Sequence, residues 1–124
     1  MTMHPFFTFH GNCREAMQFY RSCFGGTLSM IEIGQSEHAH KLPESVRKLV
    51  LHARLECDMF VMLASDLGQR SGTGNGRISL LIECDQRESK RLLSKLSDNK
   101  IQETSDSNTS VIDKFGVEWI LSHK

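Results

Sequence analysis

The sequence predicts an α+β fold made of two β-α-β-β-β modules in one chain of 124 residues. Two helix signatures support this prediction, Asn12 with Glu15 and Asp85 with Glu88. In each, a polar capping residue is followed three positions later by glutamate, which marks a helix start. Each signature follows one β-like run and precedes several more. The same order of elements therefore occurs in both halves, although their sequences share little identity.

The first module occupies about residues 1–66 and contains the clearer helix. This helix ends at Gly25-Gly26, because glycine takes the left-handed C-terminal conformation at no steric cost. Its apolar residues recur with a helical period and form one face: Cys13, Ala16, Met17, Tyr20 and Phe24. The expected strands are 6–10, 27–33, 48–56 and 60–64, with a tight Cys57-Asp58 turn between the last two.

The second module occupies about residues 77–124 and repeats this order. Its helix begins at Asp85 and ends at Asp98-Asn99. The expected strands are 77–84, 101–103, 110–112 and 117–121, the last two joined by a turn that ends in Gly116. The linker, about residues 67–76, is rich in glycine. A strand follows it rather than the helix that a phosphate-binding loop requires, so we interpret it as a flexible connection.

Composition excludes several classes of function. The chain has fifteen acidic and fifteen basic residues, so no basic field favours nucleic acid as a partner. The four cysteines lack the paired spacing of metal or disulfide frameworks, which is typical of reduced thiols in a cytoplasmic protein. The N-terminus has no signal-peptide pattern, and no segment is apolar for long enough to span a membrane. We therefore expect a cytoplasmic protein without a membrane partner.

Five short motifs stand out along the chain: Phe9-His10-Gly11-Asn12-Cys13, Phe24-Gly25-Gly26, His52-Ala53-Arg54-Leu55, Met62-Leu63-Ala64-Ser65-Asp66 and Asp113-Lys114-Phe115-Gly116-Val117 with Trp119. Together they resemble PhnB-like proteins of the vicinal-oxygen-chelate superfamily, whose members include glyoxalase I, extradiol dioxygenases and bleomycin-resistance proteins. The resemblance covers nearly the whole chain. PhnB-like proteins are also catalogued as 3-demethylubiquinone-9 3-methyltransferase domains, although no glycine-rich loop follows a strand and opens a helix here.

The resemblance implies a single glyoxalase-like domain over 1–124, with a curled mixed sheet and helices on its outer face, and a homodimer. Alternation along the strands then predicts which face of the sheet each side chain occupies. Leu49, Leu51, Ala53 and Leu55 should meet the helix, and Val50, His52 and Arg54 the cavity. Trp119 shares an apolar face and is expected to pack in the core. The candidates for lining a ligand cavity are Phe7, Phe9, His52, Arg54, Met62, Arg77, Ser79 and Glu118.

The metal ligands of the superfamily have no equivalents here. Alignment to the helix and turn landmarks brings Pro5, Met62, Arg77 and Ile120 to the ligand positions. None of these side chains suits a divalent cation, and a shift of one residue adds only His4. The pair His38 and His40 lies in a polar loop without a third ligand nearby in sequence. We therefore expect no metal and no other cofactor.

These residues predict a metal-free small-molecule binding protein, with an anionic or carbonyl-bearing ligand held by Arg54 or Arg77 and with His52 able to exchange a proton. Salt bridges from these arginines to Glu118 or Glu83 are the structural alternative. A second hypothesis is a lyase, isomerase or dioxygenase that binds one divalent metal ion through His52 and Glu118. A third is a scaffold without a pocket, because segment 102–110 is shorter than in relatives. No motif identifies catalytic residues or a substrate.

Overall fold

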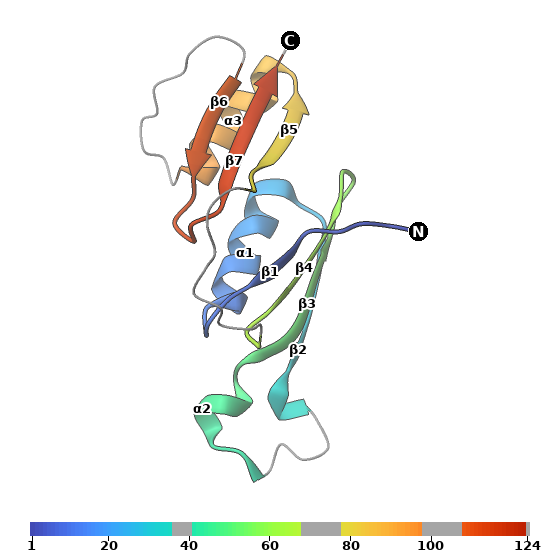
Figure 1. Cartoon of the computed structure of the whole chain (residues 1–124), viewed down its shortest axis with the longest axis vertical. Coiled ribbons are helices and arrows are strands. Elements are labelled where there is room, and N and C mark those ends of the chain that lie inside the picture. The colour runs from blue at the N-terminus through green and yellow to red at the C-terminus, as the bar shows by residue number, and fades with distance from the viewer. Residues whose placement is uncertain (36–40, 68–77, 98–107, 124) are drawn as a thin grey trace. The chain divides into compact units, whose positions relative to one another are not determined.

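Two mixed sheets, each packed against one helix, form the fold (Figure 1). The computed structural model describes residues 1–35, 41–67, 78–97 and 108–123. The chain divides into two compact units, Met1–Arg70 and Ser71–Lys124. The predicted α+β class is confirmed: among the described residues, the first unit has a four-stranded sheet and the second a three-stranded sheet.

The first unit contains the predicted β-α-β-β-β order in full. Its main elements are β1 (Phe6–Thr8), α1 (Cys13–Phe24), β2 (Thr27–Glu32), β3 (Val50–Glu56) and β4 (Val61–Ser65). The strand order is β1-β4-β3-β2, with β1 parallel to β4 and the other pairs antiparallel. Two short helices, η1 (Ile33–Gln35) and α2 (Glu44–Arg47), lie in the connection that the sequence predicts as a polar loop.

The second unit repeats this topology. Its elements are β5 (Leu80–Cys84), α3 (Gln86–Leu96), β6 (Asn108–Ile112) and β7 (Glu118–His123). The strand order is β5-β7-β6, and β5 is parallel to β7 just as β1 is to β4. In both units the first strand therefore lies beside the last. The strand expected over 101–103 and the end of the helix at Asp98-Asn99 lie outside the described residues.

The core of the first unit lies between α1 and its sheet. The buried face of α1 consists of Cys13, Ala16, Met17, Tyr20 and Cys23, which matches the predicted face except that Phe24 is half-buried. Ala53 and Leu55 on β3 face this helix together with Met62 and Ala64 on β4, and all four are fully buried. Gly25 ends the helix as predicted, with φ +75° and its N–H donating to the Arg21 carbonyl oxygen at 2.7 Å.

A β-bulge changes the predicted facing of the first residues of β3. The pairing of β2 with β3 shifts between Ile31 and Glu32, which leaves Leu51 as an extra residue in the ladder. Val50 is consequently buried, whereas Leu51 is 39% exposed. The alternation rule predicts the reverse for both residues, because it assumes a regular strand. Beyond the bulge, His52, Ala53, Arg54 and Leu55 alternate as expected.

The N-terminus of α1 is capped by a residue distant in sequence. The Asn12 side chain makes no capping hydrogen bond, so the capping box predicted for Asn12 and Glu15 does not form. Instead, Oδ1 of buried Asp66 accepts from the N–H groups of Gly11 at 2.8 Å and Cys13 at 3.1 Å. Its Oδ2 accepts from the Val50 N–H at 2.9 Å. One carboxylate thus joins the end of β4 to the starts of α1 and β3.

In the second unit, the predicted cap and the predicted core residue are both found. Asp85 accepts from the Glu88 N–H at 2.7 Å, while the Glu88 side chain pairs with Arg91 instead of completing the capping box. Trp119 is buried with Val111, Leu121, Leu92 and Leu96. The strand expected over 77–84 begins only at Leu80, and Ile78 before it is 84% exposed. Within the described ranges, no helix is long and apolar enough to cross a membrane.

The four free cysteines are expected to fall into two classes of thiol reactivity. Cys13 and Cys23 are buried, whereas Cys57 and Cys84 are half-buried. Burial raises the pKa of Cys13 to about 12, and the nearby Asp66 carboxylate adds to this shift. Burial and the neighbouring Asp85 and Glu88 carboxylates also raise the pKa of Cys84. Because only the thiolate reacts, a disulfide reagent at pH 8 should label Cys57 quickly and Cys84 more slowly in the folded protein, and all four thiols in denaturant. Cys57→Ser should remove one fast-reacting thiol; fast labelling of Cys13 would contradict the predicted burial.

Candidate functional site

In the first unit, the candidate residues that point away from the core lie on the sheet face opposite α1. One cross-strand row on it consists of Ser29, Arg54, Leu63 and Phe6, which are paired in register across β2, β3, β4 and β1. Ile31 pairs with His52 on one side of this row, and Thr27, Glu56 and Val61 pair on the other. We call these residues the open face: Phe6, Thr27, Ser29, Ile31, His52, Arg54, Glu56, Val61 and Leu63.

The open face combines charge with exposed apolar surface. Phe6 and Ile31 are both exposed, and Leu63 is half-buried beside Arg54. The Arg54 Nη2 atom lies 3.8 Å from Glu56 Oε1, and the two side chains are 42% and 61% exposed. A pair this long and this exposed contributes only about 0–1 kcal/mol to stability. Arg54 is therefore held loosely in the central row of the open face, with polar Ser29 on one side and apolar Leu63 on the other.

Phe7, Phe9 and Met62 lie elsewhere than on the open face. The Phe7 ring centroid is 5.9 Å from that of Tyr20 on α1 and 6.2 Å from that of Phe9. Met62 is fully buried opposite Leu55 on the helix-facing side. The prediction that Phe7 and Met62 point away from the helix is therefore corrected. The alternation of β1 and β4 turns both side chains toward α1. Phe6 and Leu63, which the sequence reasoning missed, take the opposite side.

In the second unit, Ser79 and Glu118, which are both candidates for lining the cavity, lie side by side. The Ser79 hydroxyl donates to Glu118 Oε1, and the Ser110 hydroxyl donates to Oε2 at 3.3 Å. Exposed Ile112 pairs with Glu118 in the β6–β7 ladder. Ser110 was not predicted, since only the pairing of β6 with β7 places it beside Glu118. Arg77 lies outside the described residues, as do His38 and His40.

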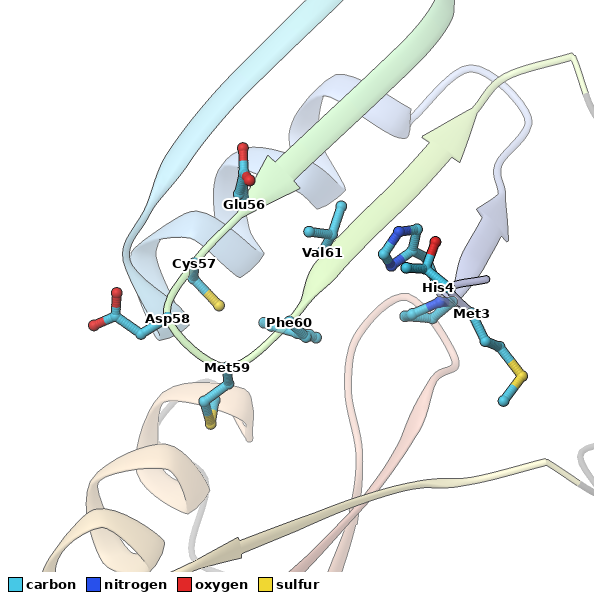
Figure 2. Close-up of a pocket in the computed structure, with 10 residues that line it drawn as sticks. Met3, His4, Glu56, Cys57, Asp58, Met59, Phe60 and Val61 are labelled. Atoms are coloured by element: carbon cyan, nitrogen blue, oxygen red, sulfur yellow. The ribbon is translucent and has the colours of Figure 1, made fainter.

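A pocket of about 470 Å³ lies at one end of the open face (Figure 2). One wall is the N-terminal segment, held beside β4 by the Leu63 N–H, which donates to the Pro5 carbonyl oxygen at 2.9 Å. The other wall is the β3–β4 turn, in which the Phe60 ring packs edge-on against Phe24 with centroids 5.2 Å apart. Glu56 and Val61 belong to both the pocket and the open face. The lining residues are Thr2, Met3, His4, Pro5, Glu56, Cys57, Asp58, Met59, Phe60 and Val61.

The residues at the expected metal positions do not fit a divalent cation. Pro5 and Ile120 have no donor atom in their side chains, and the soft thioether of Met62 is buried on the helix-facing side. In the described part of the chain, no three His, Cys, Asp or Glu side chains gather into a group suited to a metal ion. The chemistry that the open face offers is charge pairing and apolar contact.

Solved structures from three organisms have this fold. A protein from Pseudomonas aeruginosa is 25% identical with a TM-score of 0.70, and the match covers 100% of this chain and 98% of that chain. The PhnB protein of Bacillus cereus, a candidate 3-demethylubiquinone-9 3-methyltransferase, is 20% identical with a TM-score of 0.68 and covers 100% of both chains. An Arabidopsis thaliana gene product is 17% identical with a TM-score of 0.58, over 99% of this chain and 98% of that chain.

The similarity extends from fold to family. No curated protein matches the sequence. The model of one protein family, described as 3-demethylubiquinone-9 3-methyltransferase, matches residues 1–122 and thus includes both units. A fold or a family description does not by itself define a reaction, which depends on the residues of the site. The chain belongs to this family of PhnB-type proteins.

Proposed function

We propose that this PhnB-type protein is a small-molecule binding protein whose ligand lies on the open face of the first unit, without a metal ion. The observation that carries the proposal is the position of Arg54, between Ser29 and Leu63 in the central row of the open face. The guanidinium is half-exposed and only loosely paired, so a ligand can reach it. Family and fold place the chain among glyoxalase- and PhnB-like proteins, but they leave its substrate open.

The chemistry of the open face favours a ligand with an anionic group and an apolar body. The planar fork of arginine forms paired hydrogen bonds with a carboxylate or phosphate. Phe6 and Leu63 continue the row beyond Arg54 and offer apolar contact to the rest of the molecule. His52 lies one row away, beside Ile31, where its imidazole can donate to the same anionic group.

Replacing Arg54 with glutamine is expected to weaken binding without unfolding the protein. A thermal-shift screen of small carboxylates, phosphates and amino acids finds ligands, and calorimetry measures their affinity. We expect the best ligand to lose at least about tenfold in affinity, since a charged hydrogen-bonded contact contributes about 1.5–3 kcal/mol. Arg14→Gln is the matched control, because Arg14 is an equally exposed arginine of the same unit that pairs with Glu32 at 2.6 Å.

Two outcomes would contradict the proposal. An equal loss of ligand affinity in Arg54→Gln and Arg14→Gln would show that binding depends on the overall positive charge of the protein rather than on the open face. Loss of binding after treatment with a chelator, restored by one divalent metal, would favour the metal-dependent lyase, isomerase or dioxygenase instead. Elemental analysis of protein purified without a metal-affinity tag, compared with the His52→Ala variant, tests that second hypothesis directly.

A further inference from the structure

We infer that the ligand of the open face is a zwitterion, namely a free amino acid with an apolar side chain or a close analogue of one. The inference rests on the proposed function and adds the class of ligand. It starts from two opposite charges on one strand: Arg54 and Glu56 are two residues apart on β3, so both point to the open face.

The Arg54–Glu56 pair discriminates against ligands with a single charge. A lone carboxylate at Arg54 meets the negative charge of Glu56, whose Oε1 lies 3.8 Å from the guanidinium. A lone ammonium group at Glu56 meets the positive charge of Arg54 in the same way. A ligand with both groups on one carbon atom replaces the existing pair with two charge-assisted contacts and faces no like charge. The pair itself is half-exposed, so it costs little to open.

The pocket beyond Glu56 accounts for the third group of an amino acid, its side chain. Its volume of about 470 Å³ lies within the range of small-molecule sites. Met59, Phe60 and Val61 contribute apolar atoms to one wall and Pro5 to the other, while Thr2, His4 and Asp58 contribute polar atoms. The Phe60 ring is fixed by its edge-on contact with Phe24, so this wall is formed before a ligand arrives.

The order of these groups along the sheet fixes the direction in which the ligand binds. Arg54 lies toward the centre of the open face, Glu56 lies at its end, and the pocket begins at Glu56. The ligand carboxylate therefore faces Arg54, its ammonium group faces Glu56, and its side chain enters the pocket. Glu56 is the acidic partner that we assign, because it lies on β3 on the same face as Arg54, whereas Asp58 lies on the β3–β4 turn.

Three ligands with the same phenylethyl body test the inference: phenylalanine, 3-phenylpropionate and 2-phenylethylamine. Calorimetry on the full chain should give an affinity for phenylalanine at least tenfold higher than for either of the others. Glu56→Gln should bind phenylalanine no more tightly than 3-phenylpropionate, and Arg54→Gln should bind it no more tightly than 2-phenylethylamine. Glu44→Gln, which removes an exposed glutamate paired with Lys48, is the control and should keep the tenfold preference.

The results separate this inference from the proposed function. If 3-phenylpropionate binds as tightly as phenylalanine and Glu56→Gln changes neither affinity, the zwitterion inference is wrong while anion binding at Arg54 stands. The same holds if none of the three binds but another anion does so in an Arg54-dependent way. If no small molecule of the wider screen binds the open face, both fail. Thermal melting of each variant shows that it is folded before its affinity is compared.

Discussion

Replacing Asp66 with alanine is expected to lower the free energy of unfolding of the first unit by about 3–5 kcal/mol. The buried carboxylate accepts from three backbone N–H groups, those of Gly11, Cys13 and Val50, at 2.8, 3.1 and 2.9 Å. Alanine leaves these donors without their acceptor, and a hydrogen bond to a charged group contributes about 1.5–3 kcal/mol. The losses do not add fully, because the three donors share one carboxylate.

Urea denaturation followed by circular dichroism measures this loss, with Asp58→Ala as the matched control. Asp58 is an exposed aspartate on the β3–β4 turn, and its removal should change stability by no more than about 0.5 kcal/mol. Asp66→Ala should also expose the first turn of α1, so that Cys13 reacts with a disulfide reagent that spares it in the wild type. Equal stability of the two variants would show that Asp66 does not hold the three segments together.

Asp66 also illustrates which parts of the fold the sequence can predict. Local signals were reliable: the bounds of α1, most of its buried face, the Gly25 end and the Asp85 cap follow from residues close together in the chain. The true cap of α1 comes from a residue 53 positions away, which no local pattern contains. The bulge at Leu51 cannot be predicted from local sequence for the same reason, since it arises only from the pairing of β3 with β2.

The same distinction applies to the candidate site. His52 and Arg54 face away from α1, as alternation predicts, because they lie in the regular part of β3; that they line a ligand cavity stays a prediction. Phe7 and Met62 lie on the side opposite to the predicted one, because the facing of β4 depends on its register with β3 and that of β1 on its register with β4. Phe6 and Leu63 could have been found by applying alternation outward from Arg54, but only with that register known. The pocket at the β3–β4 turn joins segments that are distant in sequence and carries no motif.

Replacing Trp119 with alanine is expected to destabilise the second unit by about 4–5 kcal/mol. The indole is buried in the core between the sheet and α3, and truncation of a large aromatic residue costs about 3–5 kcal/mol. A further cost arises because the indole Nε1–H donates to Asp113 Oδ2 at 2.8 Å, and Asp113 is itself buried. Without the indole this oxygen loses a charge-assisted hydrogen bond.

Trp119→Phe helps to separate the two contributions, because phenylalanine removes the donor and keeps most, though not all, of the apolar volume. We expect it to cost about 1–3 kcal/mol, the range for a buried acceptor that loses its hydrogen bond. The Asp113 carboxylate keeps its other donors, the N–H groups of Phe115 at 2.8 Å and Val117 at 3.1 Å, so the β6–β7 turn should persist. Trp119 is the only tryptophan in the sequence, so unfolding of these variants must be followed by circular dichroism rather than fluorescence.

A double-mutant cycle with Asp113→Asn completes the test of this contact. Removing the charge at Asp113 should make the subsequent loss of the indole donor less costly, because an amide oxygen is a weaker acceptor than a carboxylate. The cost of Trp119→Phe should therefore be smaller in the Asp113→Asn background than in the wild type. If the effects of the two substitutions on the free energy of unfolding are simply additive, Trp119 stabilises the second unit through packing alone. The Asp113 carboxylate then stabilises only the β6–β7 turn, whose N–H groups donate to it.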